Sequence, residues 1–195
     1  MPFAVPIAVP QWWLFAILSL VFFALVVRAM LRRPKDSGGR SDARARLGII
    51  LQSMGIALAA FGPARPSLDW FSLAAIAGYA AVTLLMGAAI VLFGWSSTTL
   101  GKNWSFAART LDDHELIRTG PYARVRHPIY LAMLLFQLGL AAALGHWLQL
   151  IVAVPVFLVG TRIRTKAEER LLEQSFGEAF RDYRSSTPAL FPKIV

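Results

Sequence analysis

The sequence predicts an all-α integral membrane protein with five transmembrane helices. The last two of these helices form a short hairpin, and a C-terminal amphipathic helix follows on the cytoplasmic side. Hydrophobic residues make up 56% of the 195 residues and charged residues only 16%. The apolar residues also form blocks that approach the roughly 20 residues an α-helix needs to cross a bilayer. Cysteine is absent, which excludes disulfides and thiolate-based sites.

Three apolar blocks predict the first three spans. The first covers about residues 12–31, and a basic loop follows over residues 33–46. The second block, about 47–61, is short and ends at Gly62-Pro63. The third, about 70–95, begins and ends with tryptophan, which favours the membrane interface. No positive charge precedes the first block and no cleavage pattern follows it, so we expect a retained helix rather than a signal peptide.

The apolar stretch over residues 128–160 predicts the fourth and fifth spans. As one helix it would be about 50 Å long, whereas a bilayer core is only about 30 Å thick. Two short helices joined by a turn at Gly145 fit better. Apolar residues recur at helical spacing from Thr161 to about Tyr183, which predicts an amphipathic tail helix interrupted at Gly177.

The distribution of basic residues predicts the orientation. With five spans, 18 of the 20 lysines and arginines lie in three segments on one side of the membrane, and only Arg65 lies clearly opposite. Basic segments stay in the cytoplasm, so we expect the N-terminus outside and the C-terminus in the cytoplasm. The net charge of +9 then fits anionic lipid, and we expect the bilayer rather than nucleic acid as partner.

A dense polar segment precedes the fourth span at residues 120–130. Pro128 suits the first turn of a helix, which places Arg126 and His127 at its N-terminal end and turns Tyr130 inward. Arg126 can bind a carboxylate through two N–H groups, and His127 can donate, accept or transfer a proton. The alternative is that the arginines contact lipid phosphates and the tyrosines form an interfacial belt.

A second charged segment, residues 164–172, lies on the same predicted side. Glu168 and Glu169 project about 100° apart on a helix, so we expect one to bind a ligand's ammonium or ribose hydroxyls and the other to pair with a neighbour. Arg164 with Glu168, and Lys166 with Glu169, have salt-bridge spacing. The alternative is a solvated helix face.

Other motifs predict no metal or nucleotide-binding fold. The run Asp112-Asp113-His114-Glu115 lacks the ligand spacing of a calcium loop and indicates a solvated loop. The three histidines lie far apart in the sequence, so we expect no metal site. Neither a P-loop nor a Rossmann glycine motif is present, so a nucleotide-like cofactor would need another kind of pocket.

Taken together, these residues resemble the isoprenylcysteine carboxyl methyltransferase family, which is related to the membrane phospholipid methyltransferases. The resemblance covers about residues 100–195, with Phe180 standing where the family often has tyrosine. The matching elements, in order, are Gly120-Pro121-Tyr122, Arg126-His127-Pro128-Ile129-Tyr130, a helical hairpin, Glu168-Glu169 with Leu172, Phe176-Gly177, Tyr183 and Phe191-Pro192.

The resemblance implies an S-adenosylmethionine-dependent methyltransferase acting on a lipophilic, membrane-resident acceptor such as a prenylated cysteine. It implies three membrane helices with a basic loop over residues 1–100 and a catalytic, cofactor-binding region over residues 101–195. Arg126 and Glu169 are the implied catalytic residues, Arg126 by orienting an anionic acceptor. The implied cofactor-binding residues are Tyr122, His127, Pro128, Tyr130, Glu168 and Glu169.

Methyl transfer from a sulfonium needs proximity and orientation rather than a metal. A carboxylate acceptor is already ionised at neutral pH, whereas an ammonium acceptor would need a base such as His127. Three alternatives stay open: a phospholipid amine N-methyltransferase, an NADPH-dependent membrane reductase, and a transporter or scaffold. The last would use polar residues within the spans, such as Gln52, Gln137 and Gln149.

Overall fold

The computed structural model describes residues 4–32, 43–101 and 115–192, and in these ranges it is all-helical apart from two short strands. The strands β1 (Pro6–Ile7) and β2 (Arg65–Pro66) pair in parallel. The prediction of an all-α protein is confirmed. The helices are α1 (Val9–Leu31), α2 (Ala43–Ala60), α3 (Leu73–Leu100), α4 (Pro128–Leu144), α5 (Leu150–Phe176) and α6 (Glu178–Ser186).

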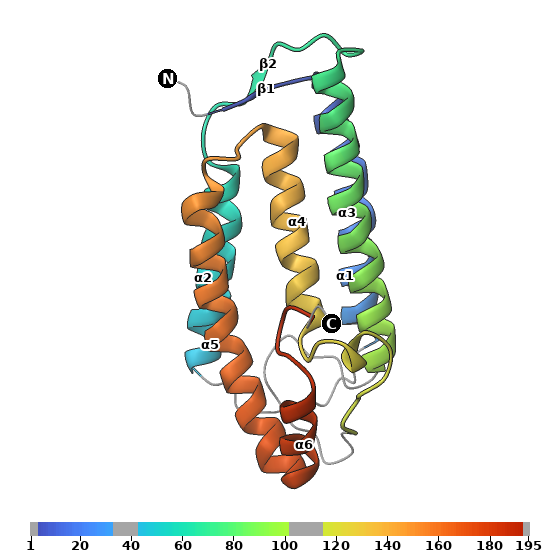
Figure 1. Cartoon of the computed structure of the whole chain (residues 1–195), viewed down its shortest axis with the longest axis vertical. Coiled ribbons are helices and arrows are strands. Elements are labelled where there is room, and N and C mark those ends of the chain that lie inside the picture. Colours follow the sequence, from blue (N-terminus) through green and yellow to red (C-terminus); the bar gives the residue numbers. More distant parts are fainter. Residues whose placement is uncertain (1–3, 33–42, 102–114, 193–195) are drawn as a thin grey trace.

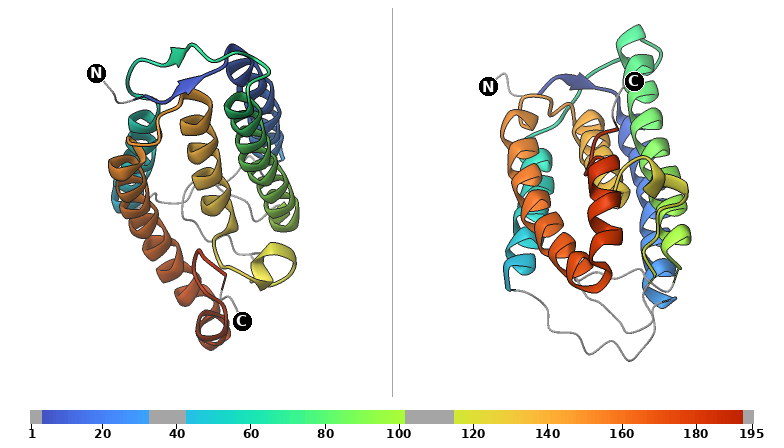
Figure 2. Two further views of the ribbon diagram at one scale, coloured as in Figure 1. Left: turned by 45° about the horizontal axis from the view of Figure 1, so that its top comes forward. Right: turned by 60° about the horizontal axis from the view of Figure 1, so that its bottom comes forward.

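The helix α4 stands between two helix pairs, α1 with α3 on one side and α2 with α5 on the other (Figure 1). The C-terminal ends of α1 and α3 and the first turns of α2 and α4 lie at the same end of the bundle, which we call the site end. The strands β1 and β2 lie at the opposite end. The helix α5 continues beyond the start of α2 and meets α6, as the tilted views also show (Figure 2).

Aromatic residues form the contact between α1, α3 and α4. The ring of Phe22 lies 4.9 Å from that of Phe136 and 5.1 Å from that of Phe93, measured between centroids. All three side chains are buried. Tilted ring pairs at this separation add favourable electrostatics to the burial of apolar surface. This cluster fixes α4 against the first helix pair.

Glycines let α2 and α5 approach closely. A Cβ atom on Gly160 would lie 2.7 Å from the carbonyl oxygen of Gly48, and one on Gly55 would lie 2.9 Å from that of Ala153. Small residues at such contacts allow helix backbones to pack closely. The close approach brings Gln52 of α2 against the charged half of α5.

The turn between α4 and α5 occurs at Gly145, as predicted. Gly145 has φ +72°, a left-handed conformation that glycine adopts without strain. A Cβ atom there would also collide with the carbonyl oxygen of Val5, at 2.2 Å. The carbonyl of Gly145 accepts a hydrogen bond of 2.9 Å from the Val5 N–H, which joins the turn to the N-terminal segment.

The predicted boundary between a fifth span and a separate tail helix is wrong. The helix α5 continues unbroken from Leu150 to Phe176 and ends only at Gly177, where φ is +52°. Gly160, which precedes the predicted boundary, is accommodated inside the helix because α2 packs directly against it. The apolar and charged halves of α5 are therefore one rigid element, and α6 is the separate C-terminal helix.

Two described helices, α1 and α3, are long and apolar enough to cross a membrane. Only 6% of the most apolar window of α1, and 22% of that of α3, is buried inside the protein. Large apolar side chains such as Leu20 and Leu84 are more than 70% exposed. Apolar helices of shorter length cover Ala45–Ala60 and Pro128–Leu144. The outer surface of the bundle is thus suited to lipid.

Candidate active site

The polar segment before α4 begins with a 3-10 turn, η2 (Gly120–Ala123). Gly120 has φ +58°, which favours glycine. A Cβ atom on it would lie 3.1 Å from both the Thr99 Oγ1 and the Trp95 Nε1 of α3. The end of α3 therefore supports the turn that leads the chain into α4.

The helix α4 begins at Pro128 with His127 as its N-cap residue, as predicted. The backbone N–H groups just before it are used by the segment after α6. Arg126 donates to the carbonyl of Pro188 and His127 to that of Ala189, both at 2.9 Å. The C-terminal segment therefore returns to the start of α4 (Figure 1).

The two glutamates of α5 hold the imidazole of His127 between them. The Nε2 atom lies 3.0 Å from Glu169 Oε1, and the Nδ1 atom lies 3.5 Å from Glu168 Oε2. Ionised carboxylates only accept hydrogen bonds, so the form of His127 that satisfies both is the doubly protonated imidazolium. The sequence predicts that one glutamate faces inward, whereas both contact His127.

Arg126 joins Glu169 to the end of the chain. Its Nε and Nη2 atoms donate to Glu169 Oε1 at 2.9 and 2.8 Å. Its Nη1 atom donates to the carbonyl oxygens of Arg184, at 3.1 Å, and Thr187. Most of the guanidinium N–H groups are thus used within the protein. This geometry gives Arg126 a positioning role, and its predicted contact with an acceptor stays a prediction.

Glu168 connects α5 to α4 and α2. It accepts a hydrogen bond from the hydroxyl of Tyr130, and its Oε1 lies 3.9 Å from the Nη2 of Arg164. The Arg164 guanidinium lies 4.9 Å from the centroid of the Tyr130 ring, a cation–π distance. Its Nη1 donates to Gln52 Oε1 at 2.9 Å, and Gln52 Nε2 donates to Thr161 Oγ1 at 2.8 Å. Buried charges need such partners.

The electrostatics of the cluster favour charged forms. Burial alone would lower the pKa of His127, but hydrogen bonds to Glu168 and Glu169 outweigh burial and raise the pKa above 6.5. Burial alone would raise the pKa of each glutamate. The contact with His127, together with Arg164 for Glu168 and Arg126 for Glu169, instead lowers it. The contacts within the cluster therefore favour the protonated form of His127 and the ionised forms of the two glutamates.

Two tyrosines extend the cluster toward η2 and α6. The Tyr183 hydroxyl donates to the carbonyl of Tyr122 at 2.6 Å, and burial raises the pKa of Tyr183 to about 12. The hydroxyl of Tyr122 is buried and has no hydrogen-bond partner among the described residues. Burial and then the charge of Glu168 raise the pKa of Tyr122 well above 10. A buried donor of this kind is costly unless a ligand satisfies it.

The structure brings most of the predicted site residues into one connected group. We call Arg126, His127, Tyr130, Arg164, Glu168 and Glu169 the polar cluster. Pro128 starts α4 beside it, and its predicted cofactor contact stays a prediction. Lys166 is exposed and takes part in none of the salt bridges of the described ranges.

Sequence reasoning gave no firm role to Arg164 and missed that of Gln52. The spacing of Arg164 from Glu168 did predict their contact, which is confirmed. A glutamine within an apolar helix was also a visible signal, but we interpreted it as a feature of transporters. Asp112, Asp113 and His114 lie outside the described residues. Among the described residues no group of three or more side chains could hold a metal ion, and the absence of a metal stays a prediction.

The fold and site define a class: a helical protein with membrane-length apolar helices and a largely buried cluster of ionisable side chains at one end of the bundle. The family model described as phospholipid methyltransferase matches residues 76–179, which is more than half of the chain. The match extends from α3 to the start of α6 and includes the whole polar cluster. The chain therefore belongs to the phospholipid methyltransferase family.

Curated relatives confirm the resemblance stated from the sequence. The chain is 30% identical over 135 residues to protein-S-isoprenylcysteine O-methyltransferase of Rattus norvegicus, covering 66% of this chain and 46% of the relative. It is 32% identical over 88 residues to the protein of that name from Schizosaccharomyces pombe, covering 45% and 37%.

A third relative has a different name. The chain is 32% identical over 104 residues to a cobalt-zinc-cadmium resistance protein of Cupriavidus metallidurans, covering 53% of this chain and 48% of the relative. The chain thus spans about half, or less, of the length of these curated relatives.

Proposed function

We propose that this protein transfers a methyl group from S-adenosylmethionine to a lipophilic acceptor in the membrane, and that the accepting group is the carboxylate of a prenylated cysteine or a similar molecule. The observation that carries the proposal is the imidazole of His127 held between Glu168 and Glu169. Membership of the family supports methyl transfer. The names of two relatives support a carboxylate acceptor.

The side chains present fit the polar groups of the methyl donor. Glu168 and Glu169 would hold its ammonium or ribose hydroxyls, and the unpartnered hydroxyl of Tyr122 would donate to one of its acceptors. The aromatic ring of Tyr130 would favour a positive charge nearby. Bound there, the donor would supply an activated methyl group: its methyl C–S bond would break as the acceptor's carboxylate oxygen formed the new C–O bond, the sulfur would keep the electron pair, and no proton would need to move.

The state of His127 favours a carboxylate over an amine as acceptor. A protonated imidazole cannot remove a proton from an ammonium group, and the two carboxylates on either side of His127 favour its protonated form and raise its pKa. A carboxylate acceptor is already ionised and needs no base. The role of the cluster is then to bind and orient two substrates and to exclude water from them.

The proposed setting is a membrane crossed by five spans, formed by α1, α2, α3, α4 and the first half of α5. The site end of the bundle would face the cytoplasm, with the N-terminus outside. The arrangement of helix ends in Figure 1 supports this proposal, because the C-terminal ends of α1 and α3, the first turns of α2 and α4 and the charged half of α5 lie toward one end of the bundle. A lipophilic acceptor would reach the cluster sideways from the bilayer.

The activity is tested with purified full-length protein, labelled S-adenosylmethionine and two acceptors, an N-acetylated S-farnesylcysteine and phosphatidylethanolamine. A methyl ester releases its label in alkali and an N-methyl group does not. We expect alkali-labile label on the prenylcysteine. The variant Glu169→Gln should lower this transfer at least about a hundredfold, because it unpairs Arg126 and His127 together.

The matched control is Glu173→Gln, one turn further along α5. Glu173 pairs with Arg181 and Arg184 at 3.0 Å on the surface, and its loss should change the rate by less than about twofold. Equal activity of Glu169→Gln and the wild type would contradict the site. Alkali-stable label on phosphatidylethanolamine would show that the acceptor is a phospholipid amine rather than a carboxylate. Saturable binding of NADPH without binding of S-adenosylmethionine would favour a reductase over a methyltransferase.

The orientation is tested on the same chain, which contains no cysteine. Single cysteines introduced at Gly39 and at Val195 should both react with an impermeant thiol reagent applied from the cytoplasmic side. Labelling of the two positions from opposite sides would exclude the five-span arrangement.

A further inference from the structure

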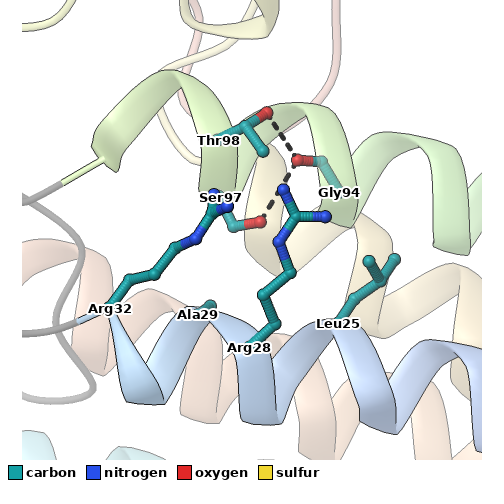
Figure 3. A pocket seen from close by; sticks show the side chains of 7 residues that line it. All are labelled: Leu25, Arg28, Ala29, Arg32, Gly94, Ser97 and Thr98. Atoms are coloured by element: carbon teal, nitrogen blue, oxygen red, sulfur yellow. Dashed lines mark hydrogen bonds between the residues drawn. The ribbon is translucent and has the colours of Figure 1, made fainter.

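A hollow lies at the site end, between the last turns of α1 and α3 (Figure 3). It has a volume of about 270 Å³. Four polar residues line it, Arg28 and Arg32 of α1 and Ser97 and Thr98 of α3. This hollow takes no part in the proposed methyl transfer.

The polar half of the hollow is suited to an anion that carries its own hydrogen-bond donors. No carboxylate of the described residues forms a salt bridge with Arg28 or Arg32. The hydroxyls of Ser97 and Thr98 donate to the carbonyl of Gly94, at 3.2 and 2.7 Å. Their protons are thus used by the helix, so the arginines supply the donors and the hydroxyl oxygens remain as acceptors.

The other half of the hollow is apolar. It is lined by Leu25 and Ala29 of α1 and by Gly94 of α3, which has no side chain to fill the hollow. A Cβ atom on Gly94 would lie 3.3 Å from Leu25 Cδ1, so the helices are close at this level. Most of α1 and α3 is apolar and exposed. A ligand of the hollow therefore has a charged end and an apolar end.

The hollow is separate from the polar cluster. On α3, Trp95 and Thr99 face Gly120 of the η2 turn, whereas Gly94, Ser97 and Thr98 line the hollow beside α1. The two sites thus use different faces of the same helix end. The polar cluster is formed by α4, α5 and the residues just before α4, which contribute nothing to the lining of the hollow.

We infer that the hollow is a binding site for an anionic phospholipid whose headgroup combines a phosphodiester with hydroxyl groups. The phosphate lies between the guanidinium groups of Arg28 and Arg32, which bind phosphate oxygens through paired N–H groups. The headgroup hydroxyls donate to Ser97 and Thr98, and an acyl chain lies against the apolar half of the hollow. The bound lipid holds the ends of α1 and α3 together at the level of the headgroups.

The test uses the full-length protein in neutral detergent and native mass spectrometry to count bound lipids. Three probes are titrated: phosphatidylglycerol, phosphatidylcholine with the same acyl chains, and inorganic phosphate. We expect one saturable phosphatidylglycerol site. The double variant Arg28→Gln/Arg32→Gln should weaken it at least about tenfold, because it loses charge-assisted hydrogen bonds.

The control Arg162→Gln/Arg170→Gln removes the same charge from two exposed arginines of α5, and it should bind within about twofold of the wild type. The variant Arg28→Lys/Arg32→Lys keeps both charges but loses the planar fork, so its affinity should lie between those of the glutamine variant and the wild type. This lysine variant decides the question if the glutamine variant does not fold.

Four results would overturn the inference. They are wild-type affinity in both hollow variants, an equal loss in the control, equal binding of phosphatidylcholine, and competition by inorganic phosphate at the same concentration. Because the readout is lipid binding, the outcome is independent of whether methyl transfer is observed.

Discussion

Replacing Gln52 by leucine should destabilise the protein and reduce its activity together. Gln52 is only 1% exposed and links α2 to α5 through its two hydrogen bonds to Thr161 and Arg164. Leucine fills a similar volume and makes neither bond. Arg164 then loses the contact that fixes its guanidinium between Glu168 and the ring of Tyr130.

The magnitude follows from the two bonds lost. A buried hydrogen bond to a charged group contributes about 1.5–3 kcal/mol. A neutral side-chain hydrogen bond between membrane helices contributes roughly 0.6 kcal/mol. We therefore expect Gln52→Leu to lower the free energy of unfolding by roughly 2–4 kcal/mol. For a chain of this size that corresponds to a fall in melting temperature of roughly 4–16 °C.

The control is Gln137→Leu in α4. Gln137 is fully buried too, but its Nε2 makes one neutral hydrogen bond of 3.1 Å to the carbonyl of Gly55, and its Oε1 has no partner among the described residues. Its replacement should cost less than about 1 kcal/mol. Both variants are melted in the same detergent at one scan rate, and methyl transfer is measured below both melting temperatures.

An equal fall in melting temperature for the two variants would refute the reasoning, because it would mean that the charge on Arg164 adds nothing to the Gln52 bond. If Gln52→Leu transferred methyl groups at the wild-type rate at a temperature where it is folded, the position of Arg164 would not matter for the proposed activity. The expected result is a larger fall in melting temperature and a loss of transfer for Gln52→Leu alone.

Three other changes give further tests. Because the folded pKa of His127 is raised, its contribution to stability is complete below pH 6.5 and is lost as pH rises through the raised pKa; the wild-type melting temperature should therefore decline with alkali relative to that of His127→Gln. Gly160→Ala places a Cβ atom 2.7 Å from the Gly48 carbonyl and should cost about 1–3 kcal/mol in thermal unfolding, whereas Gly87→Ala, with nothing within 4 Å, should be neutral or slightly stabilising. Tyr183→Phe removes a 2.6 Å hydrogen bond to the η2 turn, so it should cost about 1 kcal/mol and speed proteolytic cleavage after α6 relative to the wild type.

Local signals in the sequence predicted much of the fold. Pro128 fixes its own backbone angle and lacks an N–H, so the start of α4 could be placed to the residue. Gly145 likewise marked the turn between α4 and α5. By contrast, Gly160 is a weak helix former whose effect depends on its neighbour, and the sequence does not state that α2 lies against it. The continuity of α5 was therefore not predictable.

The candidate site was predictable in its members but not in its connections. The angle of about 100° between adjacent helical residues suggested that Glu168 and Glu169 diverge. Their side chains are long enough to reach opposite edges of one imidazole ring. The sequence alone does not show that His127 lies between them. Gln52 joins the site from another part of the chain, and no spacing rule relates it to Arg164.

The hydrogen bonds between the segment after α6 and the start of α4 have a consequence for biosynthesis. The backbone of Arg126 and His127 is bonded to Pro188 and Ala189, and Arg118 donates to the carbonyl of Ala179 at 2.7 Å. While residues 188 and 189 are still inside the ribosomal exit tunnel, the start of α4 lacks these two backbone partners. Arg126 and His127 therefore reach their full set of hydrogen bonds only after the segment that follows α6 has left the tunnel.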